Sequence, residues 1–253
     1  MPQRLGPDRR WRPVSTDLIR FVPTTGSTQA DLAARIAASE RVGEGEWLVA
    51  DRQSAGKGRQ GRTWFDATGN FMGSTVVWPG PGDPPPRTLA LVTGLAVLEA
   101  VAPLVPPPSV ALLKWPNDIL IGAAKLSGVL LERASEAVII GIGVNLAAAP
   151  QVEGRETIAL AEFGPAPDRD LFALSLAQHF DLELSRWRSY GLEPLLSRWQ
   201  AAAHPLGTPL LVGEPGEAAL AGTFAGLAAD GALQLRLADA TTRTIHAGEI
   251  RLA

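Results

Sequence analysis

The stretch VALLKWPNDILIGAAKLSGVLLERASEAVIIGIGVNL (110–146) decides the fold. It holds three short apolar runs separated by residues that favour turns: VALLKW (110–115), KLSGVLLER (125–133) and AVIIGIGVNL (137–146). A parallel crossover needs a dozen or more residues, which these gaps do not offer. WLVA (47–50) and FMGSTVVW (71–78) predict two more strands. We therefore expect an antiparallel or mixed sheet.

Helical patterns flank these strands. STQADLAARIAAS (27–39) has Ser27 or Thr28 as its N-cap, and Thr28 and Asp31 stand at capping-box spacing. TLALVTGLAVLEAVAPLV (88–105) is long and apolar enough for a buried helix. A third, amphipathic helix carries large apolar residues at four-residue steps: Phe172, Leu176, Phe180 and Leu184, with Trp187 beside them. A short fourth helix follows it. The fold class is therefore α/β (α+β).

The C-terminal part of the chain differs in character. From residue 205, short β-like runs alternate with the turns GEPGE and ADG, which predicts a small barrel beside a larger domain. The first thirteen residues hold four arginines and three prolines without periodicity. We expect a mobile arm (1–13), a catalytic or binding domain (14–204) and a small β domain (205–253).

Composition excludes several classes of protein. The net charge of −3 argues against general affinity for nucleic acid or anionic membranes, which needs an excess of cations. The chain has no cysteine, so disulfides and thiolate metal sites are excluded. We find neither a secretory signal pattern at the N-terminus nor an apolar run of about 20 residues. We expect a cytoplasmic protein.

The loop AGKGRQGRTW (55–64) gathers three glycines and three cations, which suits an anionic ligand that approaches the backbone closely. Gly56 to Thr63 is one substitution away from a P-loop, but that motif needs a helix to begin directly after it. The following TWFDATGNF contains turn residues, so we reject the P-loop. The alternative is a glycine-rich hairpin with solvated arginines.

A second concentration of polar residues is KWPNDI (114–119). Lys125 follows Lys114 by eleven residues, so the two lysines can face one pocket from paired strands. GIGVNL lacks the third glycine and the helix of a dinucleotide fingerprint, although Asn145 at its end remains a candidate ligand. The three histidines are scattered, without metal-binding spacing: His179, His204 and His246.

Together these motifs resemble those of the biotin protein ligases. The family signature is G-R-G-R-x-G-R-x-W, K-W-P-N-D, K-[LIV]-[AS]-G-[IV]-L-x-E and G-[IV]-G-x-N, and this chain has GKGRQGRTW, KWPNDI, KLSGVLLE and GIGVNL in that order. GSTQ (26–29), DRQSAG (51–56) and the late AGEIRL also match. Lys57 stands where the family commonly has arginine, which keeps the charge but loses a bidentate contact.

The resemblance implies a mixed-sheet catalytic domain related to the class II tRNA synthetases, followed by an SH3-like barrel. It also implies an ATP- and Mg²⁺-dependent reaction. Biotin is activated as biotinyl-5′-AMP and then joined to a lysine of a biotin carboxyl carrier domain. The thirteen-residue arm is too short for the winged helix of repressor members, so we expect no DNA binding. Members occur as monomers and as homodimers.

The resemblance assigns roles residue by residue, and the metal ligands stay open. For biotin it implies Ser27, Thr28, Gln29, Gln53, Lys57, Gly58, Arg59, Lys125 and Gly128. For ATP it implies Arg59, Arg62, Trp64, Lys114, Asn117 and Asn145. The catalytic residues expected are Arg59, Lys114 and Lys125. Two alternatives remain: a lipoate or octanoate ligase of the same catalytic fold, and a biotin or nucleotide sensor without turnover.

Overall fold

The computed structural model describes residues 18–213 and 219–253, which form two β-sheets and four α-helices. The predicted N-terminal arm (1–13) and most of the GEPGE turn lie outside the described residues.

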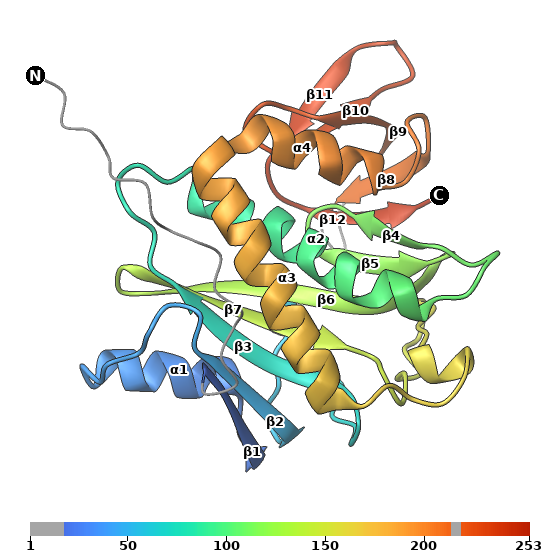
Figure 1. Cartoon of the computed structure of the whole chain (residues 1–253). Coiled ribbons are helices and arrows are strands. Elements are labelled where there is room, and N and C mark those ends of the chain that lie inside the picture. The colour runs from blue at the N-terminus through green and yellow to red at the C-terminus, as the bar shows by residue number, and fades with distance from the viewer. Residues whose placement is uncertain (1–17, 214–218) are drawn as a thin grey trace, which may run out of the picture.

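A seven-stranded mixed sheet forms the centre of the molecule (Figure 1). Its order is β1-β2-β3-β7-β6-β5-β4, in which β1 and β2 run parallel and all other neighbours antiparallel. The strands are β1 (Ile19–Thr25), β2 (Trp47–Gln53), β3 (Phe71–Val77), β4 (Ala111–Lys114), β5 (Asp118–Ile121), β6 (Ala124–Ala134) and β7 (Ala137–Val144). The predicted mixed sheet is confirmed.

Two strands of this sheet were not predicted. β1 lies at the sheet edge, is largely exposed and contains a proline, so its sequence lacks the apolar run of an inner strand. β5 has only four residues and begins directly after a Pro-Asn turn. Because β5 lies between β4 and β6, the prediction that Lys114 and Lys125 come from paired strands is wrong.

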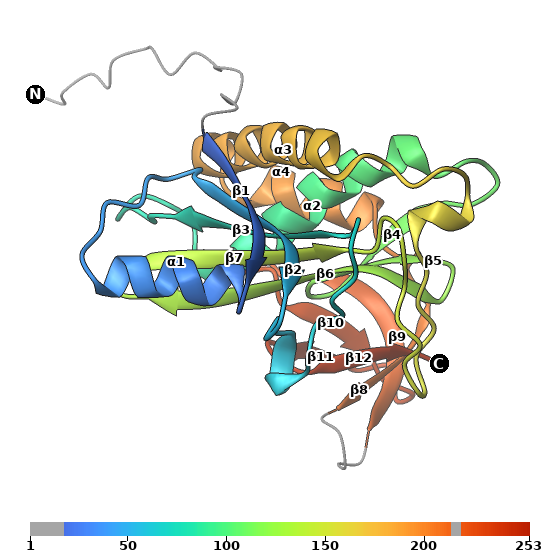
Figure 2. The ribbon, with the colours of Figure 1, turned by 90° about the horizontal axis from the view of Figure 1, so that it is seen from below.

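Helices cover both faces of the sheet (Figure 2). α1 packs on one face, α2 and α3 pack on the opposite face, and α4 packs against α2 and α3 on that side. Their bounds are α1 (Thr28–Ala37), α2 (Leu89–Val101), α3 (Arg169–Tyr190) and α4 (Leu192–Ala201). Ser27 is the N-cap of α1, and its side chain accepts from the Ala30 N–H. The predicted capping box is wrong, because Asp31 instead accepts from the Thr25 hydroxyl.

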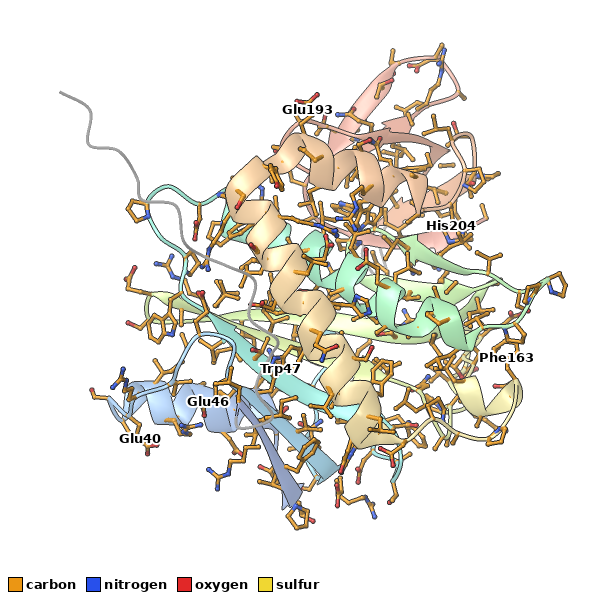
Figure 3. The ribbon with its side chains drawn as sticks, in the orientation of Figure 1. Glu40, Glu46, Trp47, Phe163, Glu193 and His204 are labelled. Carbon is orange, nitrogen blue, oxygen red and sulfur yellow. The ribbon has the colours of Figure 1, made fainter. Side chains whose placement is uncertain are left out.

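Strand alternation divides the core into two layers. Leu48 and Val76 pack with Leu32 of α1, whereas Val49 and Val77 belong to the larger cluster on the other face. Trp47, labelled in Figure 3, stands edge-on to Phe180 of α3 with ring centroids 5.6 Å apart. α2 lies deepest. Of the described helices, only the stretch around α2 (Pro86–Leu104) has the length and hydropathy of a membrane span, and 61% of that window is buried in the protein.

The C-terminal segment forms a separate antiparallel sheet of order β11-β10-β9-β8-β12. Its strands are β8 (Pro209–Gly213), β9 (Leu220–Leu227), β10 (Leu233–Arg236), β11 (Thr242–Ile245) and β12 (Glu249–Leu252). Its inner residues, among them Phe224 and Ile250, join the hydrophobic cluster of the first domain. The β-rich C-terminal domain is confirmed, and its SH3-like closure stays a prediction.

Candidate active site

One cavity of about 440 Å³ lies between the start of α1, the glycine-rich loop, the central sheet and β12. Every residue to which the resemblance gives a role lines it: Ser27, Thr28, Gln29, Gln53, Lys57, Gly58, Arg59, Arg62, Trp64, Lys114, Asn117, Lys125, Gly128 and Asn145. The fold therefore brings segments more than 100 residues apart into one site.

One end of the cavity is a closed set of buried polar side chains. Gln53 Oε1 accepts from the Thr28 backbone N–H at 2.7 Å and from the Thr28 hydroxyl at 3.1 Å. The Thr28 and Ser74 hydroxyl oxygens lie 2.7 Å apart. Because Gln53 is the last residue of β2 and Thr28 the first of α1, these bonds hold the start of the helix against the end of the strand. This end is preformed.

The floor of the cavity is made by β7. Ile139, Gly141, Gly143 and Asn145 share one face of the chain because side chains alternate along a strand. Ile139 lies in the cluster under α1, whereas a Cβ on Gly141 would fall 2.2 Å from Gln29 Oε1 and one on Gly143 would fall 2.1 Å from the Trp64 ring. The two glycines thus let Gln29 and Trp64 lie on the sheet.

The glycine-rich loop is a short hairpin. Lys57 and Thr63 form an antiparallel bridge, and a tight turn joins them, with Gln60 at φ 58° and Gly61 at φ 73°. No α-helix follows before β3, so the rejection of a P-loop is confirmed. The alternative with solvated arginines is right about the hairpin and wrong for Arg59, which donates to Asn117 Oδ1 at 2.9 Å.

Two buried polar atoms in this cavity have no hydrogen-bond partner among the described residues, Trp64 Nε1 and Asn145 Oδ1. The Asn145 amide nitrogen donates to the Ile158 carbonyl at 3.1 Å and to the Lys125 carbonyl at 3.4 Å. Buried polar groups in native proteins are normally satisfied. A ligand with a donor for Asn145 and an acceptor for Trp64 would satisfy both.

Three charged side chains from three neighbouring strands meet beside the hairpin. Asp118 Oδ1 lies 2.6 Å from Lys125 Nζ, and Asp118 Oδ2 lies 3.3 Å from Lys114 Nζ. Lys114 Nζ also donates to the Ile250 carbonyl of β12 at 3.0 Å. The two lysines therefore face one site, as the sequence predicts, but they meet across the carboxylate of β5 rather than on paired strands.

Burial and charge compete in this cluster. Burial raises the pKa of the Asp118 carboxyl, but the ammonium groups of Lys125 and Lys114 outweigh it and hold that pKa below its usual 3.8. Burial lowers the pKa of the Lys125 ammonium below 10.5, and the Asp118 carboxylate opposes this effect only in part. Lys125 thus loses its proton more readily than a surface lysine does.

Comparison with known proteins identifies the family. Residues 23–145 match the model of the biotin/lipoate A/B protein ligase family, and residues 211–252 match that of the biotin protein ligase C-terminal domain. A biotin–[acetyl-CoA-carboxylase] ligase from Mycobacterium tuberculosis is 34% identical over 98% of this chain and 92% of its own length. This chain belongs to the biotin protein ligase family.

Further relatives of the ligase agree. The biotin–[acetyl-CoA-carboxylase] ligase of Paracoccus denitrificans is 36% identical over 81% of this chain and 89% of its own. The biotin protein ligase of Aquifex aeolicus, solved with biotin and ATP, superposes with a TM-score of 0.80 at 27% identity, covering 93% of this chain and 99% of that one. The first family model includes lipoate ligases, so the C-terminal match and these relatives favour the biotin branch.

Three charged residues in the ligase cavity received no role from the sequence. Asp118 stands inside KWPNDI, where Asp in a proline turn usually bonds its own backbone. Glu249 and Arg155 come from the C-terminal domain and from the segment after β7, and their approach depends on tertiary structure. The small number of lysines was a signal of the site in the sequence. The ligase has only three, and all three line the cavity: Lys57, Lys114 and Lys125.

The histidines of the ligase lie elsewhere, since none lines the cavity. His179 contacts Glu99 at 3.2 Å, and His246 lies 3.4 Å from Asp230. Within the described residues no three His, Cys, Asp or Glu side chains gather in a metal-binding group. The cavity does hold two carboxylates, Asp118 and Glu249, and Mg²⁺ bound to phosphates needs only one or two from the protein.

Proposed function

We propose that this ligase condenses biotin with ATP to biotinyl-5′-AMP and transfers the biotinyl group to a lysine of a biotin carboxyl carrier domain. The observation that carries the proposal is the cavity itself. A closed, neutral, hydrogen-bonding end lies in the same space as six lysine and arginine side chains: Lys57, Arg59, Arg62, Lys114, Lys125 and Arg155. Biotin has a neutral polar head and a carboxylate, and ATP brings the phosphates.

The neutral end suits the ureido ring of biotin. A buried ureido group must pair two N–H donors and one carbonyl. Ser27, Thr28 and Gln53 offer hydroxyl and amide groups at this end, and Gln29 lies beside them over Gly141. A lipoyl group needs only an apolar slot, so these side chains favour biotin over lipoate.

The cationic end suits adenylation. A carboxylate oxygen of biotin attacks the α-phosphorus, the bond from that phosphorus to the bridging oxygen of the β-phosphate breaks, and pyrophosphate leaves. Lys114 and Lys125 stabilise the charge that grows on the α-phosphate, since oriented cations in a partly dry site act strongly on developing charge. Asp118 holds both ammonium groups in place. Trp64 and Asn145 offer the adenine a ring face and an acceptor.

In the second step the neutral amine of a carrier lysine attacks the acyl carbon of the adenylate. AMP leaves and the amine loses a proton. Lys57, Gly58 and Arg59 of the hairpin form a cover, in which Arg59 links Asn117 to the Gly248 carbonyl of the C-terminal domain. A cover that excludes water protects the mixed anhydride from hydrolysis.

Magnesium enters this proposal as part of the substrate MgATP. Asp118 and Glu249 are the carboxylates that can reach it in the cavity.

Gly128 makes room for the Lys125 ammonium group. It pairs with Asp118 across β5 and β6, and a Cβ at this position would lie 2.9 Å from Lys125 Nζ.

The acceptor, the location and the assembly of the ligase are also proposals. Two relatives are named as ligases of acetyl-CoA carboxylase, which supports a carrier domain of that enzyme class as the acceptor. We further propose a cytoplasmic ligase, monomeric or homodimeric, that binds neither DNA nor membrane. The acidic net charge supports the absence of general nucleic-acid binding.

Mass spectrometry of a carrier domain incubated with the protein, biotin and MgATP tests the proposal. We expect one added biotinyl group on one lysine. Incorporation of lipoate but not biotin would establish the lipoate ligase instead. Intact biotin binding without ATP–pyrophosphate exchange would establish the sensor.

A further inference from the structure

Arg155 is a cavity residue whose backbone is held next to Lys125. The Lys125 N–H donates to the Glu156 carbonyl at 2.9 Å, and the Lys125 carbonyl accepts from the Ile158 N–H at 3.0 Å. A turn closes just before, where the Arg155 N–H donates to the Val152 carbonyl at 3.1 Å. Backbone contacts thus fix the base of the Arg155 side chain beside the catalytic lysine.

The Arg155 guanidinium shares a carboxylate with the hairpin. Glu249 Oε1 accepts from Arg155 Nη2 at 2.6 Å, while Glu249 Oε2 accepts from Arg62 Nη2. The Glu249 side chain is only 18% exposed, and it is the first residue of β12. One carboxylate of the C-terminal domain therefore holds two arginines from separate segments across the cavity.

The charges of the cavity are unbalanced. The described residues of its lining include six lysines and arginines but only two carboxylates, Asp118 and Glu249, although the whole chain carries a net charge of −3. Asp118 serves Lys114 and Lys125. Among the described carboxylates of the lining, Glu249 is the one paired with Arg62 and Arg155, and Arg62 also donates to Gln60 Oε1 at 2.6 Å. Two guanidinium groups around one anion form the arrangement in which arginine binds phosphate.

We propose that Arg155 binds the pyrophosphate portion of MgATP, and that Glu249 occupies the place of that portion until the nucleotide arrives. The β- and γ-phosphates take Arg62 and Arg155 from Glu249, and Glu249 returns when pyrophosphate leaves. Arg155 is then a substrate-binding residue that lowers the charge of the leaving group. The inference rests on the proposed function, because it assigns part of the same site to ATP.

Arg155→Gln tests the assignment, with Arg155→Lys as the conservative variant. The control is Arg133→Gln, because Arg133 lies outside the cavity, its side chain is 75% exposed and it pairs with Glu136. In biotin-dependent ATP–pyrophosphate exchange we expect Arg155→Gln to raise the KM for ATP and for pyrophosphate about 10- to 100-fold, the range for lost charge-assisted hydrogen bonds. The KM for biotin stays unchanged, Arg155→Lys recovers part of the loss, and the control behaves like the wild type.

Binding of inorganic tripolyphosphate, measured by calorimetry, gives a readout without turnover. Wild type binds it and Arg155→Gln loses at least tenfold in affinity. If the wild type shows no ATP–pyrophosphate exchange but the difference in tripolyphosphate affinity persists, the result counts against the proposed function and not against the role of Arg155. Equal tripolyphosphate affinity in the two proteins would overturn the assignment. The assignment would also be overturned if Arg155→Gln raised the KM for biotin and for ATP equally and lowered the melting temperature, because Arg155 would then have only a structural role.

Glu249→Gln tests the exchange of partners. It frees both arginines, so we expect tripolyphosphate to bind at least as tightly as in the wild type. If Glu249→Gln weakened this binding as much as Arg155→Gln does, Glu249 would be a permanent support for Arg155 and the displacement would be refuted.

Discussion

The two ends of the cavity are built in different ways. At the neutral end, Thr28 at the start of α1 bonds to Gln53 at the end of β2 and to Ser74 of β3, and all three side chains are buried. At the cationic end, the hairpin is largely exposed, Trp64 and Asn145 each have a polar atom without a partner in the described part of the chain, and charges meet across three segments. One end is ready for its ligand, whereas the other is completed by it.

The largest effect is expected at the cationic end. Lys125→Ala removes an ammonium group from the place where negative charge develops, so biotin-dependent exchange should fall about 10²- to 10³-fold. Lys125→Arg keeps the charge and should lose less. Exchange kinetics with far-UV circular dichroism as the folding control measure this. Unchanged kinetics in Lys125→Ala would remove Lys125 from the chemistry.

At the neutral end the effect should be confined to biotin. Gln53→Ala removes a side chain that the proposed function places against the ureido ring, so a buried group of biotin loses its partner at a cost of about 1–3 kcal/mol. The KM for biotin should therefore rise about 10- to 100-fold with the KM for ATP unchanged, and the Thr28 N–H, which also loses its acceptor, should make the fold less stable. The matched control is Gln178→Ala, an exposed glutamine of α3. A parallel rise in both constants would mean that the two ends are not separate.

Arg59→Gly tests the cover between the ends. The change removes the contacts to Asn117 and to the Gly248 carbonyl, so the adenylate should escape and label other proteins. Streptavidin blots of a mixture of carrier and a lysine-rich bystander should show several-fold more bystander labelling than Arg133→Gly does. The ligase has only three lysines, all in the cavity, so it offers few acceptors itself. Labelling that stays specific for the carrier would contradict the role of Arg59.

Asp118→Asn should shift the pH dependence of the exchange reaction. Asp118 raises the pKa of Lys125 against the stronger effect of burial. Without the carboxylate, Lys125 loses its proton at a lower pH, so the alkaline limb of the exchange rate should move to lower pH. If the alkaline limb of Asp118→Asn stayed at the pH of the wild type, the ionisation of Lys125 would not determine that limb.

The sequence predicted the neutral end better than the cationic end. Ser27 and Thr28 stand at a helix start that the sequence predicts, although the hydrogen bond from Thr28 to Gln53 depends on the pairing of β1 with β2, which it does not predict. Asp118, Arg155 and Glu249 gain their partners only through the pairing of β5 and the docking of β12, which no local pattern encodes. The edge strand β1 was missed for the related reason that an exposed strand has little apolar pattern. The roles assigned from the resemblance, and the boundary between residues 204 and 205, stay predictions.

The central claim is that one cavity joins a ureido site to an adenylation site. Pyrophosphate exchange into ATP, measured with biotin and with lipoate as alternative acids, tests it most directly. The account predicts exchange that depends on biotin and is absent with lipoate. Exchange supported by lipoate alone would contradict it.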